Sequence, residues 1–125
     1  MVHIEELADM LDQIDAETEI YYFPAEERYV IVNVWEREDI SDADLQQMYR
    51  LPDKHELDDY GDMVRFIETL EDEEAAEWLS NAIHGKGAFR MFRAACERFH
   101  LTSDWYDFRD RMRRQKAVRW CEQTV

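Results

Sequence analysis

Glycine, proline and cysteine are scarce in this chain of 125 residues, which contains three, two and two of them. No internal repeat, low-complexity tract or flexible linker interrupts the sequence, so we expect one domain spanning residues 1–125. A domain of this size buries roughly two-thirds of its unfolded surface, so its core needs no disulfide or metal. We therefore expect Cys96 and Cys121 to be reduced thiols that mainly fill the core.

Long apolar runs are also missing, since no stretch approaches the roughly 20 residues that cross a bilayer. The N-terminal segment, MVHIEELADMLDQID, is acidic and amphipathic, which is atypical of a secretory signal or a transit peptide. These two observations predict a cytoplasmic protein that does not enter membranes.

Positive charge is in short supply as well: 15 Lys and Arg stand against 30 Asp and Glu, for a net charge of −15. This balance argues against a general nucleic-acid or anionic-membrane surface. The charge is nevertheless uneven, with 5 basic and 25 acidic residues over 1–83 but 10 basic and 5 acidic residues over 84–125. Two interpretations of this uneven charge distribution stay open. Either it has a functional role, or the basic end docks on the acidic end within the fold.

Apolar and aromatic side chains, by contrast, are plentiful at 46% and 13% of residues, which argues against disorder. Their spacing predicts an α+β fold, a mostly helical single domain of about five to six helices with a β-hairpin near the N-terminus. The expected strands cover residues 19–23 and 28–35, with Pro24–Glu27 in the turn. The expected helices cover about residues 3–15, 41–49, 58–70, 88–100 and 104–122, and another follows Glu71–Glu74 and ends near Gly85.

Local signals refine these helices. Ser41 and Thr102–Asp104 are typical N-cap sequences, and Leu51–Asp53 begins a polar connection. The residues expected to face inward in the second half are Tyr60, Met63, Val64, Ile67, Leu70, Ala75, Trp78, Leu79, Ala82, Ile83, Phe89, Phe92, Ala95, Cys96, Phe99, Trp105, Phe108, Met112 and Trp120.

Three motifs of the second half, taken in order, resemble a known bacterial family. They are Phe66–Glu73, which contains TLEDE, Ala82–Phe92, which reads AIHGKGAFRMF, and Asp104–Asp110, which reads DWYDFRD. This pattern is similar to that of the bacterial uncharacterised protein family 0158. A looser likeness of the N-terminal helix and Tyr-rich hairpin extends the resemblance to the whole chain. The resemblance implies a fold, and it brings no activity and no catalytic residues.

Three positions depart from the family pattern. His84 and Met91 stand where the family commonly has arginine, and Arg111 stands where an acid is typical. The segment 84–93 is therefore less cationic than its family counterparts, which weakens the case for an anion site there.

That segment, HGKGAFRMFR, is the first candidate site. His84, Gly85, Lys86 and Gly87 precede a predicted helix, whose free amides together with a lysine are suited to a phosphate or carboxylate. The spacing is not that of a P-loop, and no strand is predicted just upstream. The alternative is structural: Gly85 ends one helix in the left-handed conformation, and Gly87 permits the turn into the next.

Two arginines of the same segment form a second candidate. Arg90 and Arg93 are three residues apart, so they are predicted to share a helix face, opposite Phe89 and Phe92. One interpretation is a basic patch for an acidic partner. The other is pairing within the chain, with carboxylates such as those of Glu71–Glu74, Asp107 and Asp110.

The start of the last helix supplies the third candidate. Trp105 and Phe108 share one face and are expected in the core, whereas Tyr106 and Arg109 lie on an adjoining face. Exposed tyrosine and arginine are favoured interface residues. The alternative is that the aromatic stripe serves only the core.

Catalytic chemistry finds little support in the sequence. The histidines, at positions 3, 55, 84 and 100, are scattered, and no pair has the spacing of a helical metal site. The acidic runs at 58–59 and 71–74 combine with no nucleophile and no calcium-loop spacing. We therefore expect no enzyme activity, no catalytic residues, no metal and no cofactor.

The leading hypothesis is a non-catalytic cytoplasmic binding or regulatory domain that acts through protein–protein contacts. One alternative is nucleic-acid or nucleotide and phosphate binding through the basic C-terminal helices. The cations of that surface would be Arg90, Arg93, Arg113, Arg114, Lys116 and Arg119. The other alternative is an acidic nucleic-acid mimic formed by the N-terminal part.

Overall fold

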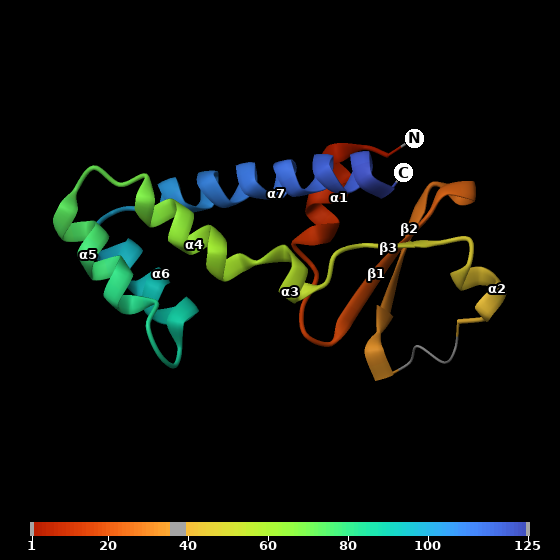
Figure 1. Ribbon diagram of the computed structural model, residues 1–125, viewed down its shortest axis with the longest axis horizontal. Helices are drawn as coiled ribbons and strands as arrows, with labels where there is room; N and C mark the ends of the chain where they lie inside the picture. Colours follow the sequence, from red (N-terminus) through yellow and green to blue (C-terminus); the bar gives the residue numbers. More distant parts are fainter. Residues whose placement is uncertain (1, 36–39, 125) are drawn as a thin grey trace. The chain divides into compact units, whose positions relative to one another are not determined.

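The computed structural model describes residues 2–35 and 40–124. Helices dominate, and a three-stranded antiparallel sheet with the strand order β2-β1-β3 includes a hairpin near the N-terminus. The predicted α+β class is therefore confirmed (Figure 1). The chain divides into two compact units: unit 1 contains the described residues up to Leu57 and from Arg113 on, and unit 2 is residues 58–112. The expectation of one domain over residues 1–125 stays a prediction.

Unit 1 begins with helix α1 (Ile4–Leu11) and the hairpin of β1 (Thr18–Phe23) and β2 (Arg28–Asn33). Between the strands lies the short 3₁₀ helix η1 (Pro24–Glu26), where proline occupies the first turn and needs no amide partner. The register pairs Thr18 with Asn33 and Phe23 with Arg28. The predicted hairpin and its turn are therefore confirmed, but β2 ends at Asn33 and does not extend to residue 35 as predicted.

The segment after the hairpin differs from the expectation. Ser41 caps helix α2 (Asp42–Leu45) as predicted, because its hydroxyl accepts a hydrogen bond of 3.1 Å from the Asp44 amide. The helix does not continue to Tyr49, however. Strand β3 (Tyr49–Arg50) pairs with β1, and the Leu51 amide donates to the Ile20 carbonyl at 2.8 Å. Pairing with an open strand edge thus replaces the predicted last helical turn.

Helix α3 (Lys54–Leu57) lies in the segment that was predicted to be a polar connection. Asp53 accepts a hydrogen bond of 2.8 Å from the Glu56 amide, which satisfies a donor of the first turn. The turn places Leu57, which is 1% exposed, in the core of unit 1.

The core of unit 1 joins α1, the sheet and the C-terminal part of helix α7 (Thr102–Thr124). Trp120 packs edge-on against Tyr22, with ring centroids 6.5 Å apart, and donates from Nε1 to the Arg50 carbonyl at 3.2 Å. One side chain thereby contacts two strands. The buried members of this core are Leu7, Ala8, Leu11, Ile20, Tyr22, Leu51, Leu57, Ala117 and Trp120.

Unit 2 contains α4 (Asp59–Glu68), α5 (Glu73–Ala82), α6 (Ala88–Arg98) and α7 as far as Met112. Carboxylates fix the starts of α4 and α5. Asp58 accepts from the Gly61 amide at 3.1 Å, and Asp72 accepts from the amides of Glu74 and Ala75. The predicted cap Thr102–Asp104 instead forms the first turn of α7, which begins at Thr102.

An aromatic cluster fills the core of unit 2. Phe92 is fully buried, and its ring centroid lies 4.8 Å from that of Trp105 and 6.2 Å from that of Phe66, both nearly perpendicular. Such edge-to-face pairs add to the gain from burial. The buried members are Met63, Phe66, Leu79, Ile83, Phe92, Ala95, Cys96, Trp105 and Phe108.

Three residues predicted to face inward are half-exposed instead. Trp78 is 45% exposed, and the Arg98 guanidinium lies over its ring at 4.3 Å, so a cation–π contact takes the place of burial. Phe89 is 45% exposed because it lies in the first turn of α6, at the edge of the core. Tyr60 is 43% exposed, and its hydroxyl donates to the Ile83 carbonyl.

None of the helices in residues 2–35 and 40–124 combines the length and the apolar character that crossing a bilayer requires.

Candidate functional site

The HGKG segment joins α5 to α6. Gly85 and Gly87 have φ values of +102° and +71°, the region that favours glycine, as the structural interpretation predicted. His84 donates from Nδ1 to the Ser80 carbonyl, one turn back in α5. The Met91 amide donates to the Gly87 carbonyl at 2.9 Å, which starts α6. The glycines therefore serve the geometry of a helix–helix junction.

The cations of this junction extend outward. Lys86 and Arg90 are exposed, and a side-chain carbon added at Gly87 would lie 3.9 Å from the Arg90 guanidinium. Over residues 2–35 and 40–124, neither cation forms an ion pair within 4.0 Å. The hydrogen bonds of residues 84–87 in this part of the chain go to α5 and α6.

Replacing Gly85 with alanine tests the geometric role. The added methyl group meets no atom within 4 Å, so the cost comes from the backbone conformation alone. We expect a loss of about 1–2 kcal/mol in the free energy of unfolding, measured by urea denaturation. Gly87→Asn is the matched control, because asparagine tolerates φ near +71°, and it is expected to cost less than half as much. Equal stability of Gly85→Ala and the wild type would contradict the junction role.

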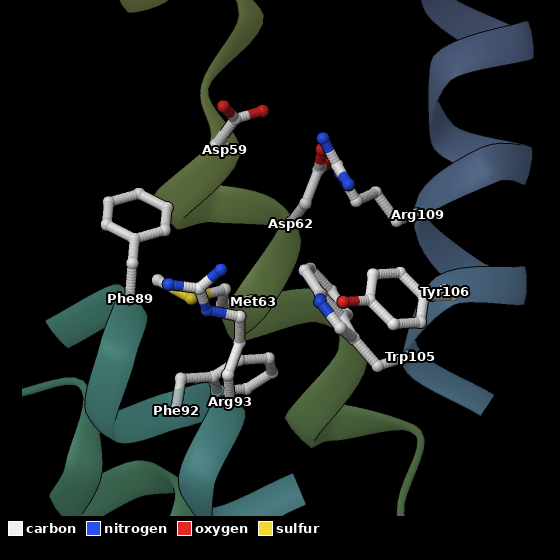
Figure 2. Close-up of a pocket in the computed structure, with 9 residues that line it drawn as sticks. All are labelled: Asp59, Asp62, Met63, Phe89, Phe92, Arg93, Trp105, Tyr106 and Arg109. Carbon is white, nitrogen blue, oxygen red and sulfur yellow. The ribbon is translucent and has the colours of Figure 1, made fainter. Parts of the chain in front are cut away.

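A cavity of about 210 Å³ lies in unit 2 among α4, α6 and α7 (Figure 2). It brings together three predicted site residues, Arg93, Tyr106 and Arg109. The other five, His84, Gly85, Lys86, Gly87 and Arg90, do not line it. We call it the arginine–tyrosine cavity; its full lining is Asp59, Asp62, Met63, Phe89, Phe92, Arg93, Trp105, Tyr106 and Arg109.

The lining of this cavity has a buried floor and an exposed mouth. Met63, Phe92 and Trp105 are 7% exposed or less, whereas Phe89 and Tyr106 are each 45% exposed. Arg93 was predicted on a face opposite Phe89, but it lines the same cavity. Positions 89 and 93 are one helical turn apart, so their side chains lie on the same face of α6.

Charges of both signs meet in the cavity. Asp62 is 1% exposed, and its Oδ1 accepts a hydrogen bond of 2.9 Å from Arg65. Figure 2 shows the Asp62 carboxylate and the Arg109 guanidinium pointing toward each other. Arg93, by contrast, forms no ion pair within the part of the chain that the structure describes, so its predicted pairing with nearby carboxylates does not occur.

Asp59, Asp62 and Phe89 were not among the residues predicted for a site. Asp62 lies four residues before the buried Phe66. A carboxylate on an apolar helix face, with an arginine three residues later, is the signal that points to it.

The basic residues of the C-terminal helix are largely engaged within unit 1. Arg113 is 3% exposed and its Nε donates to Asp12 Oδ1 at 2.9 Å. Arg114 pairs with Glu5, and Lys116 donates to the Leu57 carbonyl. Here the basic end of the chain does bind its acidic end. Arg113 in particular cannot belong to an exposed basic surface.

Comparison with known proteins gives no assignment, since no family model, curated protein or solved structure matches the chain. Membership of family 0158 therefore stays a prediction. Among residues 2–35 and 40–124, no three His, Cys, Asp or Glu side chains are grouped to hold a metal ion.

The two cysteines are free thiols in different units: Cys96 is buried in unit 2, and Cys121 is partly buried in unit 1. Burial raises the pKa of the Cys96 thiol from 9.0 to about 11. Because the folded state holds the thiol proton more tightly, it binds more protons than the unfolded chain does between pH 9 and about pH 11.

The contribution of Cys96 to stability should therefore be constant below pH 9 and decline as pH rises toward 11, by about 2 kcal/mol in total. Urea denaturation between pH 8 and pH 11 measures it. Cys96→Ala removes the titrating group and should show a shallower decline over this window than the wild type. Parallel pH profiles for the two proteins would show that the thiol is not responsible.

Proposed function

We propose that the protein is a non-catalytic cytoplasmic binding or regulatory domain and that the arginine–tyrosine cavity of unit 2 is where it binds a protein partner. One observation carries the proposal. Phe89 and Tyr106, both half-exposed, flank Arg93 at the mouth of a cavity whose floor is aromatic.

The residue types support a protein contact. Tyrosine and arginine dominate the residues whose truncation weakens interfaces most, and aromatic side chains are enriched at interface centres. Arg93 forms no ion pair among the described residues, although the chain has twice as many acids as bases. A carboxylate of the partner would neutralise Arg93 while an apolar side chain covers Phe89.

The charges inside the cavity favour a structural use over a catalytic one. Asp62 accepts a hydrogen bond from Arg65 and points toward Arg109 (Figure 2), so this carboxylate is already engaged with basic side chains of unit 2. Among the residues that the structure describes, no serine, threonine, cysteine or lysine lines the cavity. Asp62 is best understood as a group that positions Arg65 and Arg109.

Site-specific photocrosslinking tests the proposal. A photoreactive phenylalanine analogue at position 89 or 106 is expected to capture the same partner protein in cells. Position 91 is the matched control, since Met91 is 49% exposed on the same helix but does not line the cavity. Arg93→Glu, combined with the probe at position 106, should reduce capture about tenfold. Capture that is equal at positions 89 and 91, or unchanged by Arg93→Glu, would refute the proposal.

A further inference from the structure

A second cavity in unit 2, of about 560 Å³, shares no lining residue with the arginine–tyrosine cavity. It is formed where α4 and α6 end and where α5 and α7 begin. We call it the acidic cleft, because Glu71, Asp104 and Asp107 line it with a single basic residue, Arg111.

Three carboxylates of the acidic cleft have no basic partner in the part of the chain that the structure describes. Glu71, Asp104 and Asp107 are exposed, and within residues 2–35 and 40–124 none of them forms an ion pair. Arg111 lines the same cleft, but its guanidinium lies over the Phe108 ring at 5.6 Å. A fourth acid, Asp72, caps α5 and is used by the helix.

The floor of the cleft is apolar. Leu70, Phe99 and Leu101 are only partly buried there, packed against the core that contains Phe66 and Phe108. Partly covered aliphatic and aromatic surface beneath a rim of like charge is a poor arrangement for an isolated domain. The rim charges repel one another and the apolar surface remains in contact with water.

We propose that the acidic cleft binds a cationic amphipathic segment of a partner protein, whose apolar side chain covers Leu70, Phe99 and Leu101 while its Lys or Arg side chains meet Glu71, Asp104 and Asp107. Charge complementarity identifies the occupant. A simple cation would leave the apolar floor exposed to water, so the occupant also needs an apolar side chain. The carboxylate rim repels anionic membranes and nucleic acid. This site is separate from the arginine–tyrosine cavity, which suits a partner with carboxylates.

Fluorescence anisotropy with two labelled peptides tests the inference on the full chain. Both peptides carry six lysines in the same positions, and one has leucines at helical spacing where the other has serines. The leucine peptide is expected to bind at least about tenfold more tightly, since it covers the apolar floor. Glu71→Gln combined with Asp107→Asn should weaken it about tenfold.

The net charge of −15 makes a charge-matched control essential, because any cationic peptide is attracted to this chain. Glu77→Gln with Glu97→Gln removes the same charge from exposed positions of unit 2 that line neither cavity. This control should weaken binding less than about twofold. Phe89→Ala should leave it unchanged, which separates this site from the arginine–tyrosine cavity.

Two results would overturn the inference: equal affinities of the leucine and serine peptides, or equal weakening by the cleft and control variants. Either result would assign the binding to the overall negative charge. Circular dichroism checks that each variant keeps the wild-type helix content.

Discussion

Replacing Phe92 with alanine is expected to lower the free energy of unfolding by about 3–5 kcal/mol. Phe92 is fully buried at the centre of unit 2, where its ring meets those of Phe66 and Trp105. The substitution removes the ring from the core, leaves a cavity and abolishes both edge-to-face contacts. Urea denaturation, followed by tryptophan fluorescence and by circular dichroism, measures the change.

Met91 provides the control for this experiment, because it is the preceding residue of α6 and is 49% exposed. Met91→Ala should change the free energy of unfolding by less than about 0.5 kcal/mol. If Phe92→Ala cost less than about 1 kcal/mol, Phe92 would not lie at the centre of a packed core.

Arg113→Ala is the second variant with a large expected effect, a loss of about 3 kcal/mol in the free energy of unfolding. Arg113 is 3% exposed, and its Nε donates to Asp12 Oδ1 at 2.9 Å. Alanine removes both the buried aliphatic stem and the partner of the Asp12 carboxylate. The Asp12 side chain is 40% exposed, so water partly replaces the lost partner, which places the loss at the lower end for buried pairs.

Two companion variants divide this effect into its parts. Arg113→Met keeps most of the buried stem without the charge, so it should recover at least about 1 kcal/mol relative to alanine. Asp12→Asn keeps the shape of the partner and leaves Arg113 with a neutral acceptor, so its cost measures the charge–charge part of the pair. The neighbouring Arg114→Ala, at an exposed pair with Glu5, should cost less than about 1 kcal/mol. Equal costs for Arg113→Ala and Arg114→Ala would contradict the buried role of Arg113.

Sequence signals located most helices because their causes are local. Ser41 hydrogen-bonds within three residues of itself, and the Glu71–Glu74 run marks the start of α5 through the cap at Asp72. Apolar spacing likewise identified Trp105 and Phe108 as core residues, with Tyr106 on an exposed neighbouring face. These features require only the period of a helix and the hydrogen bonds of its first turn.

Features that depend on distant residues were not visible in the sequence. Strand β3 has two residues, too few for alternation, and exists because β1 offers an open edge at Tyr21 and Tyr22. The spacing of apolar residues predicted that Trp78 is buried in the core. It does not show that Trp78 is half-exposed and that Arg98, twenty residues later, lies over its ring.

The candidate site was partly predicted. Arg93, Tyr106 and Arg109 were identified one by one, from residue type and helix face, and the fold brings them to one cavity. Their acidic neighbours Asp59 and Asp62 come from a third helix, and no local pattern ties that helix to the other two. The grouping of charges is therefore a property of the packing of unit 2.

The division of the chain into two units affects the order in which their cores can form during synthesis. Residues 58–112 form unit 2 from one continuous stretch, whereas the core of unit 1 also needs Ala117 and Trp120 from the end of the chain. During vectorial synthesis the hairpin therefore emerges before unit 2, yet its core is complete only after Ala117 and Trp120 have been synthesised. Unit 2, synthesised later than the hairpin, has its whole core available earlier. The hairpin of unit 1 is thus synthesised before unit 2, but the core of unit 1 is completed after the core of unit 2.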